Sequence, residues 1–213
     1  MPRSYVRLRK ALVATARSMN GLGINQGASG NVSARAGKGF LITPSALPYD
    51  QTGPDDIVFM DMDGTPRDKR KPSSEWRFHR DIYAARPEAG AIVHTHATHA
   101  TSLACLHKSI PSFHYMVAMA GGDDIRCAPY ATYGTQELSD HALEALRGRK
   151  ACLLANHGMI AFGSDLEGAL ALAVEVESLA RQYWQALQIG KPKLLTRAQM
   201  AEVIEKFSDY RPG

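Results

Sequence analysis

Two histidines separated by a single residue form the stretch of this sequence that points most directly to chemistry. His94 and His96 end the run AIVHTH, and the residues before them are apolar. In a β-strand, residues i and i+2 project from the same face, so two imidazoles in this spacing can bind one cation without bending the backbone. A catalytic metal ion usually has about three protein ligands and one open position. The pair therefore predicts a third ligand from another segment.

His157 is the best candidate for that third ligand. It stands in the run ANHG, at the end of another apolar stretch, and Gly158 is expected to let the backbone turn sharply beside the metal. Three imidazoles with a carboxylate suit zinc best, with manganese and cobalt as alternatives. His99 is the less favoured candidate for a further ligand, because it lies where the next helix is expected to begin. The remaining histidines are interpreted as ordinary polar or supporting residues: His79, His107, His114 and His141.

A carboxylate near the start of an expected helix has two interpretations. In the run Ser73-Ser74-Glu75, Ser74 suits the N-cap of the helix, and a glutamate in the first turn is favoured by the helix dipole. Alternatively, Glu75 faces the metal and moves a proton to or from a carbon that the metal acidifies. The two hydroxyls and the exposed N–H groups of a helix start would also suit a phosphate group. The local sequence leaves both interpretations open.

Hydrophobic periodicity predicts an α/β domain. Five helices are expected at residues 5–19, 74–85, 137–146, 166–187 and 197–207, and strands at residues 31–35, 40–43, 57–62, 91–96, 151–156 and 159–162. Because the early strands follow one another, a single layered α/β domain over residues 1–213 is favoured over a strict βα repeat. No glycine-rich phosphate loop follows a strand, which argues against dinucleotide-binding and P-loop folds.

Composition argues against a nucleic-acid or membrane protein. The formal net charge is +4, and the one concentrated basic stretch, residues 67–71, is interrupted by an aspartate and lacks interleaved aromatics. We interpret it as a solvated loop, with attraction of a phosphorylated substrate as the alternative. Apolar runs are far shorter than the roughly 20 residues of a membrane span, and no signal peptide is recognised. Cys105, Cys127 and Cys152 are interpreted as buried thiols in a reducing compartment, so a cytoplasmic location is expected.

Several motifs resemble the class II aldolase/adducin family, and most closely its bacterial L-fuculose-1-phosphate aldolase branch. The most specific are residues 73–79 (SSEWRFH), residues 94–96 (HTH), residues 110–116 (IPSFHYM) and residues 127–134 (CAPYATYG), within a similarity that runs from residue 21 to residue 207. The resemblance implies a three-layer α/β/α domain around a central mixed or antiparallel sheet. It also implies a metal-dependent aldehyde-lyase that cleaves a ketose 1-phosphate to dihydroxyacetone phosphate and a short aldehyde such as lactaldehyde.

The same resemblance implies how the site is assembled. One zinc ion per subunit would be held by His94, His96 and His157, with Glu75 as a movable fourth ligand and acid/base. Tyr115 would reach in from the adjacent subunit of a homotetramer, whose active sites lie between subunits, and transfer the proton of the aldehyde-side oxygen. The phosphate side would be formed by Gly30, Asn31, Ser45, Ala46, Ser73 and Ser74, and the aldehyde side by Tyr133 and Tyr210.

Two departures from the family pattern bear on the choice of sugar. Ser45-Ala46 stands where the branch usually has Thr-Gly; the serine supplies the same hydroxyl, but the methyl group of Ala46 restricts the backbone. Asn156 stands where relatives carry histidine or glutamine. Sugar-phosphate epimerases, dehydratases and oxo-acid-phosphate decarboxylases of the same fold remain alternatives. A non-catalytic adducin-like scaffold and a Schiff-base lysine enzyme are disfavoured, because the ligands are retained and no lysine lies within the motif-bearing strands.

Overall fold

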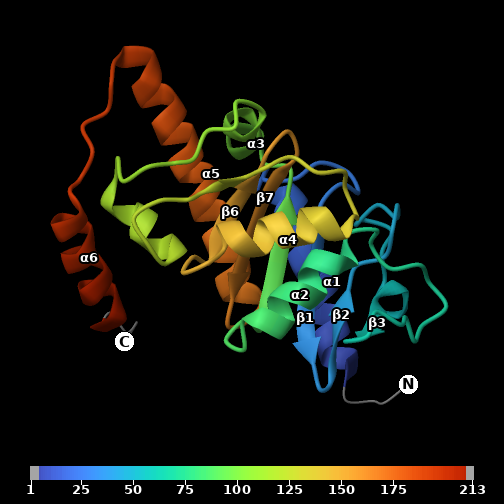
Figure 1. Ribbon diagram of the computed structural model, residues 1–213. Helices are drawn as coiled ribbons and strands as arrows, with labels where there is room; N and C mark the ends of the chain where they lie inside the picture. Colours follow the sequence, from blue (N-terminus) through green and yellow to red (C-terminus); the bar gives the residue numbers. More distant parts are fainter. Residues whose placement is uncertain (1–4, 210–213) are drawn as a thin grey trace.

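A mixed β-sheet forms the centre of the computed structural model, which describes residues 5–209 (Figure 1). Within that range, the sheet has seven strands in the order β3-β2-β1-β4-β7-β6-β5. Their bounds are β1 Asn31–Ala36, β2 Gly39–Ile42, β3 Val58–Asp61, β4 Ala91–Thr95, β5 Cys127–Ala128, β6 Ala151–Leu154 and β7 Gly158–Gly163. Neighbouring strands are antiparallel, except for the parallel pair β5 and β6. The register places Asn31 of β1 opposite His94 of β4.

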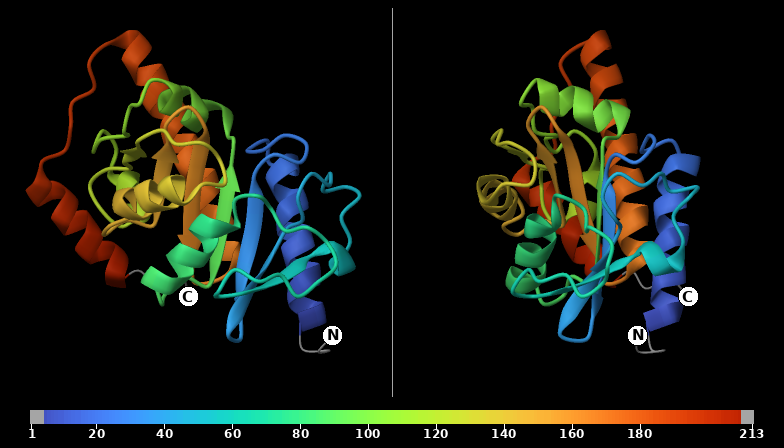
Figure 2. Two further views of the ribbon diagram at one scale, coloured as in Figure 1. Left: turned by 45° about the vertical axis from the view of Figure 1, so that its right-hand side comes forward. Right: turned by 90° about the vertical axis from the view of Figure 1, so that its right-hand side faces the viewer.

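Helices cover both faces of this sheet. Helices α1 (Val6–Gly21), α3 (Thr98–Cys105) and α5 (Leu166–Ile189) lie over one face, and α2 (Trp76–Ala85) and α4 (Gln136–Ala145) lie over the other (Figure 2, right). Successive strand residues point to opposite faces. In β4, Val93 accordingly packs in the hydrophobic cluster under α1 and α5, and Ile92 packs in the cluster under α2 and α4. The predicted three-layer α/β/α architecture is confirmed.

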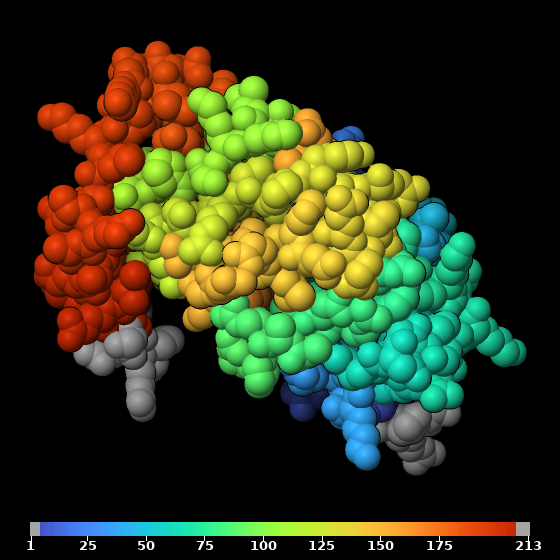
Figure 3. Space-filling view, in the orientation of Figure 1, coloured from blue at the N-terminus to red at the C-terminus, as the bar shows by residue number. Residues whose placement is uncertain are grey.

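The chain after α5 packs at one edge of the molecule. Helix α6 (Arg197–Asp209) contacts the 3₁₀ helix η3 (Tyr115–Ala120), and Figures 1 and 3 show α6 with the end of α5 along that edge. A second 3₁₀ helix, η2, spans Pro54–Asp56. Among the described helices, none is long and apolar enough to cross a membrane.

A buried ion pair fastens the loop that leads to α2. Arg9 Nη2 of α1 lies 2.8 Å from Asp68 Oδ2, and each side chain is only 6% exposed. The same carboxylate oxygen accepts the Phe59 backbone N–H at 2.7 Å. In this basic stretch, Arg67 and Arg70 form exposed pairs with aspartates. Ion pairs of Arg67, Asp68 and Arg70 thus fasten this loop to neighbouring segments. The residues of this stretch do not line the cleft described below.

The predicted helices and strands are present, with ends that differ by a few residues. Strand β5 was not predicted, because two residues are too few to carry a period-two pattern. The prediction of three buried thiols is wrong for Cys105, which is exposed at the end of α3; Cys127 is half-buried and Cys152 is buried. All three are free.

Candidate metal centre and active site

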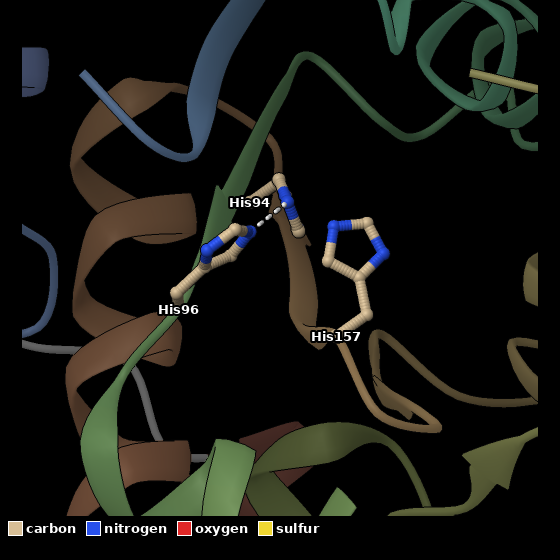
Figure 4. A group of neighbouring side chains, drawn as sticks. All are labelled: His94, His96 and His157. Atoms are coloured by element: carbon tan, nitrogen blue, oxygen red, sulfur yellow. Dashed lines mark hydrogen bonds between the residues drawn. The ribbon is translucent and has the colours of Figure 1, made fainter. Parts of the chain in front are cut away.

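Three histidine rings converge at the end of the central strands. His94 and His96 come from β4 and its end, and His157 comes from the turn between β6 and β7 (Figure 4). Their ring centroids are 4.9–5.1 Å apart, and each pair of ring planes is inclined by 73–75°. One ligand nitrogen from each ring lies within 4.8 Å of the other two. The rings therefore share one small volume, as the i, i+2 spacing predicts.

The backbone fixes which nitrogen of His94 faces this volume. His94 is fully buried, and its Nδ1 donates a hydrogen bond to the Met159 carbonyl of the adjacent strand at 2.9 Å. A carbonyl only accepts, so Nδ1 carries a proton and Nε2 is the nitrogen directed at the cluster. Nε2 lies 3.2 Å from Nε2 of His96. This arrangement orients the ring as a metal ligand requires.

Glu75 lies between the rings instead of acting as a residue of the first helical turn. Helix α2 begins at Trp76, and Glu75 itself occupies the N-cap position without a capping side-chain bond. The expectation that Ser74 caps the helix is therefore wrong. The backbone N–H of Glu75 bonds to the Ser73 hydroxyl at 3.3 Å, and the carboxylate is free to turn toward the histidines. Its Oε2 lies 3.2 Å from His94 Nε2, and its Oε1 lies 3.2 Å from His157 Nε2.

These four side chains fit a divalent cation. Glu75 is 6% exposed, and its buried Oε1 accepts no hydrogen bond although His157 Nε2 is close. Among the described residues this buried oxygen has no hydrogen-bond partner, and a cation held between it and the rings would supply one. In a tetrahedral zinc site with bonds of about 2.0–2.1 Å, ligand atoms are about 3.3 Å apart, which is close to the 3.2 Å separations found here. A donor set of imidazoles and one carboxylate suits zinc, manganese or cobalt.

The electrostatics of the site keep its ligands ready for a cation. Burial raises the pKa of Glu75, but the neighbouring His94 and His157 and the Asn31 amide lower it more, to about 2. Burial and the charge of His94 lower the pKa of His96 and of His157 to about 4. For His94, burial lowers the pKa, but the carboxylate of Glu75 outweighs it and raises the value. Near neutral pH, the carboxylate is ionised and two of the three rings carry free lone pairs.

A cleft of about 310 Å³ opens beside the cluster. Every residue assigned above to the phosphate side lines it: Gly30, Asn31, Ser45, Ala46, Ser73 and Ser74. Glu75, His96 and His157 also line it, as do the aromatic residues Tyr130 and Tyr133. The cleft thus brings hydroxyls, amides and aromatic rings together with two of the three histidines and Glu75.

The chain was compared with known proteins. A model of the class II aldolase and adducin N-terminal domain family matches residues 10–184. The 5-methylthioribulose-1-phosphate/5-deoxyribulose-1-phosphate aldolase of Rhodospirillum rubrum is 60% identical over 99% of this chain and 95% of that protein. The L-fuculose phosphate aldolase of Escherichia coli K12 is 49% identical over 96% of this chain and 95% of that protein. A solved L-fuculose 1-phosphate aldolase superposes with a TM-score of 0.91 at 39% identity, covering 94% of this chain and 95% of that one.

The chain belongs to the class II aldolase and adducin family. The family model and the named aldolases, which match almost end to end, place this protein among the aldehyde-lyases.

Two of the residues that line the cleft of this class II aldolase take a backbone conformation that glycine would adopt more easily. Ala46 lies at φ 55° and Asn156 at φ 55°. Ala46 therefore keeps the left-handed conformation that the family's glycine favours, despite its methyl group. Asn156 makes the turn before His157, and its Oδ1 accepts a hydrogen bond of 2.6 Å from His107 Nε2. The sharp turn thus falls on Asn156.

The prediction that Gly158 makes this turn is wrong. Gly158 has no left-handed φ and already belongs to β7. A Cβ built on it would lie 2.4 Å from the Thr95 carbonyl oxygen and 3.0 Å from His96 Cδ2. The glycine is needed for close approach between β7 and the strand that carries His94 and His96.

The remaining site residues predicted from the sequence differ in whether they line the cleft of this aldolase. Tyr133 lines it, whereas Tyr115 lies on η3, is 49% exposed and does not line it within one chain. Tyr210 is outside the described residues. His99 is directed elsewhere, because its Nδ1 donates to Glu177 Oε1 of α5 at 2.7 Å.

Sequence patterns alone do not single out two residues near the site. Tyr130 lines the cleft, and only its place in the CAPYATYG motif hints at that. His79 is fully buried behind Glu75 on α2. The only sign of His79 in the sequence is its place one helical turn after Glu75, and this spacing does not distinguish a supporting residue from a core residue.

Proposed function

We propose that this aldolase is a metal-dependent enzyme that reversibly cleaves a ketose 1-phosphate to dihydroxyacetone phosphate and a short aldehyde. One observation carries the proposal. A buried carboxylate with an oxygen that has no hydrogen-bond partner among the described residues lies among three histidines, and it lines a cleft that also presents hydroxyls and amides. That combination suits proton transfer at a carbon next to a polarised carbonyl, in a substrate that also carries a phosphate.

His94, His96 and His157 would hold one zinc ion per subunit, with Glu75 as a fourth ligand that moves; manganese and cobalt are alternatives. When bound, the cation supplies a Lewis acid that stabilises negative charge on the substrate's carbonyl oxygen. The protein's part is to keep the histidine rings oriented, as the Met159 carbonyl does for His94. Of the three rings, His94 is buried, whereas His96 is exposed and His157 is partly exposed, so the cluster opens onto the cleft.

Glu75 would serve as the acid/base for the donor half of the substrate. In cleavage, the C3–C4 bond breaks, the C4 hydroxyl loses its proton, and the electron pair of the bond passes to the donor half. Glu75, after taking up a proton from solvent, delivers it to C3, which gives dihydroxyacetone phosphate. Its lowered pKa, to about 2, keeps the carboxylate ionised when no substrate is bound, so it acts as a base in the synthetic direction.

The phosphate would bind at Gly30, Asn31, Ser45, Ala46, Ser73 and Ser74. The Ser45, Ser73 and Ser74 hydroxyls and the Asn31 amide are groups that donate to phosphate oxygens. Holding the phosphate fixes the donor half of the substrate against the acid/base group, which lowers the entropic part of the barrier.

The aldehyde side would be completed by a second copy of the chain. Tyr133 lines the cleft of its own chain. We propose that Tyr115 of an adjacent subunit relays the proton of the C4 hydroxyl to solvent, and that Tyr210 helps to line this side. Tyr115 is half exposed on η3, as a residue that serves a neighbour requires. The proposal includes a homotetramer with active sites between subunits, located in the cytoplasm, where free thiols stay reduced.

For the substrate we propose 5-deoxyribulose 1-phosphate and 5-methylthioribulose 1-phosphate ahead of L-fuculose 1-phosphate. The relative named for the first two is 60% identical, against 49% for the fuculose phosphate aldolase. Tyr130, Ala131 and Tyr133 line the cleft, and such apolar surfaces suit an aldehyde with a short apolar tail. L-Fuculose 1-phosphate, whose aldehyde product carries one more hydroxyl, is the second candidate because of the TM-score of 0.91.

The test offers the zinc-loaded protein each of the three ketose phosphates and, separately, an oxo-acid phosphate, and it measures dihydroxyacetone phosphate with a coupled dehydrogenase. The chelator-treated protein is the control, and added zinc should restore its activity. Cleavage of the ribulose derivatives with the highest kcat/KM is expected. Formation of an epimer, a dehydrated sugar or carbon dioxide from an oxo-acid phosphate, without aldehyde, would replace this proposal with one of the other reactions found on the fold. Full activity of the chelated protein would refute the metal-dependent scheme.

A further inference from the structure

A chain of four buried polar side chains runs behind Glu75. Asn31 and Ser33 come from β1, two residues apart on one face of the strand, and His79 and Tyr83 come from α2, one helical turn apart. Each is at most 2% exposed. Polar groups this deeply buried are costly unless they are hydrogen-bonded.

The contacts form one unbranched series. Tyr83 OH lies 2.8 Å from Ser33 Oγ, and Ser33 Oγ lies 2.7 Å from His79 Nδ1. His79 Nε2 bonds to Asn31 Oδ1. The Asn31 amide nitrogen then donates to Glu75 Oε2 at 2.9 Å. The series therefore begins in the core between α2 and the sheet and ends on the carboxylate of the candidate metal centre.

The direction of every hydrogen bond follows from the last one. A carboxylate can only accept, so the Asn31 NH₂ group faces Glu75 and its oxygen faces His79. That oxygen also only accepts, so His79 Nε2 carries the proton. The ring is fully buried, which disfavours the charged form and lowers its pKa to about 3. Nδ1 of the neutral ring is then an acceptor, Ser33 donates to it, and Tyr83 donates to Ser33.

We propose that His79 is a positioning residue whose Nε2–H tautomer fixes the orientation of the Asn31 amide and, through it, the position of the Glu75 carboxylate. This inference rests on the proposed function, because it assigns His79 a role in the proton transfer by Glu75. If the tautomer were reversed, Nε2 would become an acceptor and the Asn31 amide would have to rotate. The amide oxygen would then oppose the Glu75 carboxylate, two acceptors at hydrogen-bonding distance.

Asn31 connects this series to the substrate side as well. It lines the cleft, and its amide has a second N–H besides the one given to Glu75. The same amide can therefore donate to a phosphate oxygen while it holds the carboxylate. A fixed amide orientation would align the phosphate group and the acid/base group with each other, and this alignment is what His79 would secure.

The tautomer can be tested without any enzymatic assay. Nitrogen NMR of protein labelled with ¹⁵N-histidine reports the protonation of each ring nitrogen, and the His79→Gln spectrum identifies the His79 signals. We expect the neutral Nε2–H form at pH 7 in both the metal-free and the zinc-loaded protein. An Nδ1–H tautomer or a charged ring would overturn the inference, whatever reaction the enzyme catalyses.

The effect of His79 on proton transfer by Glu75 is tested with dihydroxyacetone phosphate alone. The zinc-loaded protein should exchange a proton on the hydroxymethyl carbon of dihydroxyacetone phosphate with deuterium from solvent. His79→Phe keeps a ring of similar shape but removes both hydrogen bonds, and the exchange rate should fall roughly 10–100-fold, as for other residues that orient the groups of a metal site. His79→Gln can still donate toward Asn31 and should recover most of the rate. Ile82→Val, a buried change on the same helix outside the series, controls for packing.

The outcomes separate this inference from the proposed function. If the zinc-loaded wild type exchanges no proton, the proposed function fails, and the tautomer measurement still decides the hydrogen-bond series. If the wild type exchanges and His79→Phe does so at the same rate with bound zinc, His79 has no positioning role. If His79→Phe does not fold, His79→Gln takes its place, and a rate for His79→Gln as low as that of Asn31→Leu would also overturn the inference.

Discussion

A methyl group added at Gly158 should weaken metal binding far more than its size suggests. The Cβ of an alanine there would lie 2.4 Å from the Thr95 carbonyl oxygen and 3.0 Å from His96 Cδ2, and contacts under 3.0 Å essentially never occur. The strand carrying His94 and His96 must therefore move by at least about 0.6 Å relative to β7, whereas metal–ligand distances tolerate only about 0.2 Å. We expect zinc affinity to fall at least about tenfold, and the free energy of unfolding of the metal-free protein to fall by about 1–3 kcal/mol.

Zinc affinity would be measured by competition with a chromophoric chelator, and stability by urea denaturation of the metal-free protein. Gly21→Ala is the matched control, because a Cβ at Gly21 has nothing within 4 Å. Gly158→Ala with the zinc affinity of the wild type would show that the strands yield without moving the ligands, and the close-approach argument would be wrong.

Four further changes have defined expected outcomes. Glu75→Gln should retain zinc by metal analysis yet lose roughly 10²–10⁴-fold in proton exchange; normal turnover would leave Glu75 as a helix-end residue only. Ala46→Gly relieves a left-handed backbone at φ 55° and should raise the free energy of unfolding by about 1 kcal/mol in denaturant titrations. Asp68→Ala leaves Arg9 buried without its partner and should lower the free energy of unfolding by about 3–5 kcal/mol; a loss below that of a surface pair would contradict the argument. Burial raises the pKa of Asp81, but hydrogen bonds from an adjacent arginine and two polar side chains outweigh it and lower the pKa below its ordinary value. The ionised carboxylate therefore stabilises the fold above about pH 4. Asp81→Asn should have a lower free energy of unfolding than wild type at pH 7, and the difference should shrink as the pH falls through the lowered pKa.

Local periodicity is enough to predict where the candidate metal ligands come from. His94 and His96 share a face because a strand has a period of two, and His157 follows an apolar run that forms the neighbouring hairpin. The layered architecture also follows from local patterns, since strands and amphipathic helices leave few ways to bury their apolar faces.

The rest of the site depends on contacts between distant segments, which one sequence does not reveal. Nothing local to His79 shows that Ser33 and Asn31 lie beside it, because the packing of α2 on β1 brings them together. Gly158 reads as a turn glycine until the distance to Thr95 is known. Ser74 suits an N-cap by residue type, but Glu75 takes that position, and its carboxylate lies 3.2 Å from His94 Nε2.

The register of the central strands bears on how the stability of the protein depends on the concentration of free metal. Asn31, His94 and the turn bearing His157 lie on strands that are distant in the chain and adjacent in the sheet. No short unfolded segment contains both His94 and His157, so an ion held by both would bind the native state almost exclusively. The concentration of free metal would then set the folding equilibrium through mass action, about 2.7 kcal/mol of added stability at 100 times the dissociation constant. When the ion is scarce, the protein would thus be both inactive and less stable, and therefore shorter-lived.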